Sequence, residues 1–199
     1  MNMHYYDDFK EMLDCLNQKL IEVNAEIEIR AIGGFAMMCN SMVLNFDARN
    51  ASVDIDAYNE YTDNIKTLIK DVSLEFEVND DWLNTDWRDD YTMKYHSEDG
   101  IVIGLNGWEW IPSTDIVLSN IKIFYANVEG LFAMKLRSVN ERFEQQEEPR
   151  LNDITDLISI LKLFEENDLD NVKNELIQKL LKHYVWAKDY LAGVLANQE

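Results

Sequence analysis

The chain has 199 residues, which is enough for one compact domain or two small ones. Its 18 basic and 38 acidic residues give a formal net charge of −20. This charge disfavours nucleic acid as a partner without excluding it, because nucleic-acid binding depends on Lys and Arg that neutralise phosphates. A basic partner protein or a small-molecule partner fits the charge better, although an acidic surface can also serve solubility alone.

The cysteines and the apolar runs bear on the compartment of the protein. Cys15 and Cys39 lack the spacing of a zinc or redox motif and lie in apolar helical patterns, so we expect them to be reduced core residues. No apolar run approaches the roughly 18 residues that a membrane span needs. The first residues also lack the basic and apolar regions of a signal peptide. We therefore expect a cytoplasmic protein with no membrane contact.

The first elements in chain order are a helix, a strand and a shorter helix. Apolar residues recur at three- and four-residue spacing over 5–23, which predicts an amphipathic helix. Residues 26–32 alternate polar and apolar side chains, as a half-buried strand does. After Gly33 and Gly34, the apolar run 35–44 predicts a short, largely buried helix.

The Gly33-Gly34 pair therefore lies between the end of a strand and the start of a helix. Glycine lets backbone N–H groups approach a ligand closely. Free N–H groups at a helix N-terminus, together with the helix dipole, favour an anion. We interpret the pair as a phosphate-binding turn.

A second strand, predicted over 52–57, carries an Asp-x-Asp motif. Because side chains alternate along a strand, Asp54 and Asp56 are expected on the same face. Two carboxylates on one face repel each other and are costly to bury without a cation. The pair therefore indicates a site for Mg²⁺ or Mn²⁺, although a polar strand face on a very acidic protein would show the same residues.

The remainder of the chain predicts a few more strands and then only helices. Apolar patterning predicts a helix over 59–70 and strands over 74–78, 101–105, 115–118 and 121–125. The acidic, aromatic stretch 79–99 is expected to be a loop, either over the site or pinned to the core by its Trp rings. Helices are expected over 128–144, 152–166, 170–183 and 184–196. The predicted fold class is α/β (α+β), with a small mixed β-sheet flanked by helices in residues 1–127 and a helical bundle in residues 128–199.

The order of Gly-Gly, helix and Asp-x-Asp resembles the DNA polymerase β nucleotidyltransferase superfamily, and most closely its abortive-infection (AbiEii-like) nucleotidyltransferases. The residues that match the superfamily motif are Gly33, Gly34, Asp54 and Asp56. In the subgroup, the second half of the motif is Arg-x-Thr/Ser-x-Asp-x-Asp. Arg49 and Ser52 nearly reproduce its first part, with one residue more between them. Ser52 is therefore a candidate phosphate contact. Arg49 either contacts a phosphate or pairs with Asp47.

A second match lies downstream. Met134-Lys135-Leu136 is similar to a helix motif of the subgroup, and Asp153-x-x-Asp156-Leu157 is similar to its Asp-x-x-Asp-Leu. In relatives the helix Lys lies near the triphosphate and the later Asp residues help to build the site, which implies the same roles for Lys135, Asp153 and Asp156. The residues themselves leave other roles open. Lys135 could bury its stem and keep its head in water, and Asp153 could cap a helix.

The resemblance implies a metal-dependent nucleotidyltransferase that moves an NMP from an NTP to an acceptor hydroxyl of a protein, an RNA or a small molecule. It also implies a component of a toxin–antitoxin or phage-defence system. Asp54 and Asp56 are the expected catalytic and metal-binding residues, with Mg²⁺ or Mn²⁺ as the cofactor. The expected substrate-binding residues are Gly33, Gly34, Arg49, Ser52, Lys135, Asp153 and Asp156.

One departure from the superfamily concerns a third carboxylate, which active members usually carry on a later strand. No position in this chain identifies itself as that residue, although Glu75, Glu77 and Asp115 lie in or beside predicted strands. The departure leaves an alternative open. The protein could be a catalytically silent nucleotide-binding module or an antitoxin-like protein-interaction module.

Overall fold

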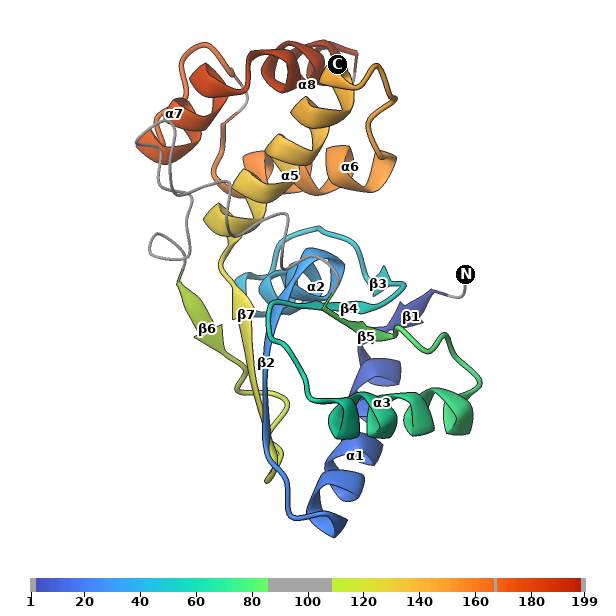
Figure 1. Ribbon diagram of the computed structural model, residues 1–199. Helices are drawn as coiled ribbons and strands as arrows, with labels where there is room; N and C mark the ends of the chain where they lie inside the picture. The colour runs from blue at the N-terminus through green and yellow to red at the C-terminus, as the bar shows by residue number, and fades with distance from the viewer. Residues whose placement is uncertain (1–2, 86–108, 167, 198–199) are drawn as a thin grey trace.

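Figure 1 shows the computed structural model of the protein, which describes residues 3–85, 109–166 and 168–197. Within these ranges the fold combines seven helices with a mixed five-stranded sheet and a two-stranded sheet. This confirms the predicted α+β class. The strand expected over 101–105 and most of the loop expected over 79–99 lie outside the described residues. None of the described helices is long and apolar enough to cross a membrane.

The five-stranded sheet forms the centre of the fold. Its strands, in spatial order, are β5 (Leu83–Asn84), β4 (Ile55–Ala57), β2 (Ile27–Ile32), β7 (Ile121–Ala126) and β6 (Trp110–Pro112). Strands β2 and β7 pair in parallel, as do β4 and β5, whereas β4 is antiparallel to β2 and β6 is antiparallel to β7. The alternation along β2 and β7 buries Ile29 and Tyr125. The strands predicted at 26–32 and 121–125 are thus confirmed.

The strand predicted over 52–57 is divided into two short strands. Ala51–Ser52 form β3, which pairs with β1 (His4–Tyr5) in the separate two-stranded sheet. Asp54 lies just before β4, while Asp56 lies within it. The N-terminal strand therefore holds the backbone of Ser52 next to the start of β4.

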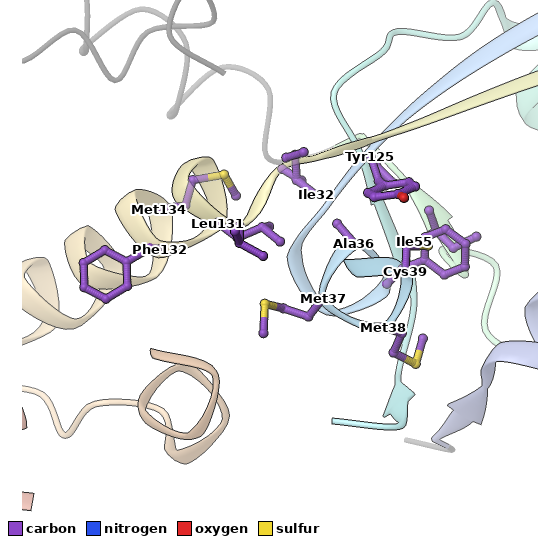
Figure 2. Close-up of a cluster of buried hydrophobic side chains, with 14 of the residues drawn as sticks. Ile32, Ala36, Met37, Met38, Cys39, Ile55, Tyr125, Leu131, Phe132 and Met134 are labelled. Atoms are coloured by element: carbon purple, nitrogen blue, oxygen red, sulfur yellow. The ribbon is translucent and has the colours of Figure 1, made fainter. Parts of the chain in front are cut away.

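Three helices pack beside the sheet: α1 (Tyr6–Glu22), α2 (Gly33–Leu44) and α3 (Asp63–Phe76). Figure 1 shows them to one side of β2 and β7. Helix α2 is almost wholly apolar and is buried over most of its length. Figure 2 shows α2 between β4 and α5 (Val128–Glu144), with Met37 pointing toward the α5 side and Leu131 pointing back toward α2. Helix α2 thus connects the sheet to the C-terminal helices through apolar packing.

Two of the predicted strands are wrong. Residues 74–76 belong to α3, where Leu74 is 66% exposed and Glu75 pairs with Lys19 of α1 at 2.5 Å. A five-residue alternation fits the surface of an amphipathic helix as well as it fits a strand. Residues 115–118 form no strand, because Val117 is 81% exposed and the N–H of Ile116 donates back to the Ser113 hydroxyl in a turn.

The four predicted C-terminal helices are confirmed. They are α5, α6 (Leu151–Leu163), α7 (Glu175–His183) and α8 (Val185–Ala196), and Figure 1 shows them together at one end of the molecule. Helix α5 begins directly after β7, where the side chain of Asn127 caps it by accepting a hydrogen bond from the N–H of Gly130 at 3.0 Å. Because β2 and β7 are parallel and α5 follows β7, the first residues of α5 lie near the carboxyl ends of both strands.

Candidate active site

A cavity of about 400 Å³ lies at the end of β2, where the first turn of α2 meets α5 and α6. Every residue that sequence analysis placed in the site lines this cavity, except Asp156: Gly33, Gly34, Arg49, Ser52, Asp54, Asp56, Lys135 and Asp153. These residues come from separate segments of the chain, so the fold brings together groups that the sequence only suggested were related.

The glycine pair lets the backbone of α2 approach the other site residues. Gly33 has φ of +62°, and a Cβ at this position would lie 2.3 Å from Asp56 Oδ2. A Cβ on Gly34 would lie 2.3 Å from Ser52 Oγ and 2.8 Å from Arg49 Nη1. No side chain among the described residues caps this helix N-terminus. The first-turn N–H groups and the helix dipole therefore favour an anion at the cavity wall.

The two aspartates converge on one side, and Asn84 of β5 contacts both of them. The Asn84 amide donates hydrogen bonds to Asp54 Oδ2 at 3.0 Å and to Asp56 Oδ1 at 3.2 Å. Burial, the charge of Asp56 and the charge of Asp81 raise the pKa of Asp54 to about 7, while Arg49 and Asn84 act in the opposite direction. A raised pKa is expected where two carboxylates share a partly buried site without a cation.

The donor set fits a hard divalent cation. Mg²⁺ is commonly held by one or two carboxylates, with water and substrate phosphate completing its shell. The described residues contain no group of three or more His, Cys, Asp or Glu side chains arranged to hold a metal. Asp54 and Asp56 would therefore be the protein ligands, and the remaining positions would be left to water and a phosphate.

Behind the glycine turn lies a buried cluster of four charged side chains, two basic and two acidic. Arg49 donates to both carboxylate oxygens of Asp156, through Nε to Oδ1 at 3.0 Å and through Nη2 to Oδ2. Lys135 Nζ lies 2.6 Å from Asp156 Oδ2 and 3.1 Å from Asp153 Oδ1. Ser138 donates to the second oxygen of Asp153 at 3.0 Å. The side chains of Asp156 and Lys135 are 1% and 7% exposed, whereas those of Arg49 and Asp153 are 17% and 15% exposed, so the cluster is buried at Asp156 and reaches the cavity at Arg49 and Asp153.

The cluster decides between the roles that the sequence left open. The head of Lys135 pairs with two carboxylates instead of extending into water. Asp153 accepts hydrogen bonds from Lys135 and Ser138, and the cap position of α6 belongs to Arg150. The ionic partner of Arg49 is Asp156. Asp156 lies behind the cavity wall and forms ion pairs with Arg49 and Lys135, the two basic side chains that line the cavity.

The candidates for a third carboxylate lie elsewhere. Glu75 bonds to Lys19 and Cys15 between α3 and α1, and Glu77 terminates α3 in a left-handed conformation. Asp115 lies beside Tyr6, where burial and this carboxylate raise the pKa of the phenol. None of the three lines the cavity.

Sequence reasoning missed several residues of the site. Ser138, Arg150 and Asn152 line the cavity, and Asn84 bonds to the aspartates. The sequence could have identified Ser138, because it lies three residues after Lys135 and therefore on the same helix face. Asn84 reaches the aspartates only through the parallel pairing of β5 with β4, which the sequence pattern does not specify.

A second cavity, of about 490 Å³, lies between α1 and the end of α3. Its lining residues are Met3, His4, Asp8, Glu11, Met12, Phe76, Glu77 and Val78. These include three carboxylates and neither Lys nor Arg, so a phosphate would be repelled there. The 400 Å³ cavity is therefore the candidate for phosphate chemistry.

No known protein family, curated protein or solved structure matches this chain.

Proposed function

We propose that this protein is a metal-dependent nucleotidyltransferase, which moves an NMP from an NTP to an acceptor hydroxyl by breaking the α–β phosphoanhydride bond and releasing pyrophosphate. The observation that carries the proposal is the contact between the glycine turn and the aspartate pair. A Cβ on Gly33 would lie 2.3 Å from Asp56 Oδ2, so an anion bound at the N-terminus of α2 would lie beside two carboxylates. Phosphate and carboxylate repel each other. A divalent cation between them makes the arrangement favourable, and an NTP with Mg²⁺ has this charge pattern.

The chain supplies both neutral and cationic contacts for a triphosphate. Backbone N–H groups of Gly33 and Gly34 would bind phosphate oxygens, and the Ser52 hydroxyl lies against Gly34. Arg49 and Lys135 line the same cavity and supply hydrogen-bond donors to it, with their charges balanced by Asp153 and Asp156. Because Asp156 fixes the side chains of Arg49 and Lys135, these side chains need to move little when the phosphates bind.

Asp54 and Asp56 would hold the cation. When bound, Mg²⁺ or Mn²⁺ supplies charge neutralisation for the phosphates and lowers the pKa of an attacking hydroxyl. The part played by the chain is to present two ionised carboxylates. Since Asp54 has a pKa of about 7 in the cation-free protein, it releases a proton when it becomes a ligand near neutral pH.

The acceptor class follows from charge. A net charge of −20 disfavours RNA as the acceptor, so a hydroxyl of a protein or of a small molecule is favoured. Membership of the AbiEii-like nucleotidyltransferases, and a place in a toxin–antitoxin or phage-defence system, belong to the same proposal. Their support is the match at the glycine turn, the aspartates and Lys135.

A second candidate function is a nucleotide-binding or antitoxin-like module without catalysis. The observation that favours it is the neutral amide of Asn84, which contacts the aspartate pair from the neighbouring strand where a third carboxylate could have stood. Such a module would bind an NTP and leave it intact.

Transfer of label from α-³²P NTPs tests the proposal. The purified protein is incubated with each NTP, Mg²⁺ or Mn²⁺, total RNA and a cell protein extract. We expect labelled protein or a labelled small molecule, absent with Asp56→Asn, whose thermal stability should be unchanged or higher because carboxylate repulsion is relieved. Bound NTP without any transfer would support the silent module. Absence of NTP binding would contradict both functions.

A further inference from the structure

Asn84 occupies the position next to Asp56 on the adjacent strand. In the parallel pairing of β4 and β5, Ile55 is opposite Leu83 and Asp56 is opposite Asn84. Neighbouring residues in register point to the same face of a sheet. The side chain of Asn84 is therefore directed to the side that carries the two carboxylates, and both of its donor hydrogens are used there.

The orientation of the amide follows from its surroundings. If the amide were turned over, its carbonyl oxygen would face two carboxylate oxygens, which is repulsive. In the observed orientation Asn84 Oδ1 is buried and has no hydrogen-bond partner among the described residues. A buried acceptor without a partner costs free energy. The two charge-assisted bonds to the aspartates are what outweigh this cost and fix the amide.

We propose that Asn84 is a positioning residue for the divalent cation: its amide fixes the directions of the Asp54 and Asp56 carboxylates so that the pair binds the cation. The inference rests on the proposed function of the same site. Asn84 takes one oxygen of each carboxylate, Oδ2 of Asp54 and Oδ1 of Asp56. This restricts the rotation of both groups and holds Asp56 Oδ2 against the Cα of Gly33, on the side where a phosphate would bind.

The neutral amide has a second consequence. A carboxylate at residue 84 would add a third negative charge to Asp54 and Asp56, beside the charge of Asp81 that already acts on Asp54. The amide instead donates to both aspartates and stabilises their ionised forms. Hydrogen bonds to metal-ligating carboxylates typically change metal affinity by about 10- to 100-fold when they are removed.

Binding of Mn²⁺ alone, followed by electron paramagnetic resonance of the free ion, tests the inference without any assay of activity. We expect Asn84→Ala and Asn84→Leu to weaken Mn²⁺ binding by about 10- to 100-fold. Asn84→Leu keeps the branched shape of the side chain and removes both its donors and its unpaired acceptor. A loss confined to Asn84→Ala would assign the effect to packing and overturn the inference, as would unchanged or tighter binding in both variants.

Binding of inorganic tripolyphosphate in EDTA is the control for a general structural effect. Its expected contacts are the glycine turn, Arg49 and Lys135, which line the cavity and do not include Asn84, so we expect both Asn84 variants to bind it as the unaltered protein does. Weakening of tripolyphosphate and Mn²⁺ binding to the same extent would overturn the positioning role. If the unaltered protein bound no Mn²⁺, with or without an NTP, the proposed function itself would fail, and this outcome is distinct from a failure of Asn84 alone.

Discussion

Arg49 and Asp156 are 107 positions apart in the chain, yet the guanidinium of one donates to both carboxylate oxygens of the other inside the protein. Arg49 precedes β3 in the sheet-containing part, and Asp156 lies in α6. The pair therefore joins the loop beside the glycine turn to the C-terminal helices. Lys135 of α5 shares the same carboxylate, so one buried acid fixes two cations of the cavity wall.

Removal of Asp156 should be strongly destabilising. Asp156→Ala leaves Arg49 without its ionic partner and deprives Lys135 of one of its two carboxylates, and breaking a buried pair typically costs about 3–5 kcal/mol. Urea unfolding measures this loss. Asp170→Ala is the matched control, because Asp170 pairs with Lys188 at 2.5 Å but is 80% exposed and should cost less than about 1 kcal/mol. Equal losses in the two variants would contradict a structural role for Asp156.

A methyl group at Gly34 should close the phosphate site. Gly34→Ala places a Cβ 2.3 Å from Ser52 Oγ and 2.8 Å from Arg49 Nη1, so those groups must move away from the N-terminus of α2. We expect affinity for an NTP, measured by calorimetry, to fall by at least about tenfold, or 1.4 kcal/mol.

Gly193→Ala is the control for that substitution. Gly193 is in the interior of α8, and apart from the adjoining helix backbone no atom of the described residues lies within 4 Å of a Cβ placed there. Alanine there should stabilise the protein by about 0.5–1 kcal/mol and leave NTP binding unchanged. If Gly34→Ala kept full NTP affinity, the glycine turn would not be the phosphate site.

The pH dependence of stability should change with Asp54→Asn. Because the pKa of Asp54 is raised from 3.8 to about 7, the folded protein holds this proton more tightly than the unfolded chain. The corresponding stabilisation is complete below about pH 4 and is lost as the pH rises through 7. At pH 8 in EDTA, Asp54→Asn should therefore be more stable than the unaltered protein by about 1–2 kcal/mol, after allowance for solvent screening.

The measurement is thermal unfolding of both proteins between pH 5 and pH 8. The difference in stability should grow with pH, and Mn²⁺ should reverse its sign at pH 8 by stabilising only the protein that has both aspartates. A difference that stayed constant between pH 5 and pH 8 would mean that Asp54 is ionised throughout this range and would contradict the raised pKa.

Lys135 should matter for the triphosphate, whereas Arg142 of the same helix should not. Lys135 lines the cavity, and Arg142 bonds to Glu147 and to the Glu148 carbonyl away from it. Lys135→Met removes a charged contact worth about 1.5–3 kcal/mol, so NTP affinity should fall by about 10- to 100-fold. Arg142→Ala should leave it unchanged. Equal NTP affinities in the two variants would mean that Lys135 does not contact the triphosphate.

The sequence sufficed for those parts of the fold where local patterns are long. The amphipathic spacing of α1 and the regular helical patterns after residue 128 predicted helices that the structure contains. The five-residue alternation at 74–78 was too short to separate strand from helix, and α3 extends through Phe76. The break between Ser52 and Ile55 depends on the pairing of β1 with β3, which is a tertiary contact.

In the site, too, the sequence indicates the motif residues but not the tertiary contacts between them. The motif residues from Gly33 to Asp153 were identified from the sequence and line one cavity. The burial of Asp156 and its contacts with Arg49 and Lys135 depend on how α5 and α6 pack, and no local pattern encodes that. The contacts of Asn84 depend on the register between the edge strand β5 and its neighbour β4. What the sequence could not provide was thus the set of partners that hold the motif residues in place.

In the proposed reaction, the NMP of an NTP is attached to an acceptor hydroxyl and pyrophosphate is released. The most direct measurement compares α-³²P and γ-³²P forms of each NTP in one extract with Mn²⁺, with every new labelled species resolved by chromatography and electrophoresis. We expect the α label on the acceptor and the γ label only in the released pyrophosphate, with neither product formed by Asp54→Asn or Asp56→Asn. Transfer of the γ label to an acceptor, or an NTP that is bound and never converted, would contradict the proposed reaction.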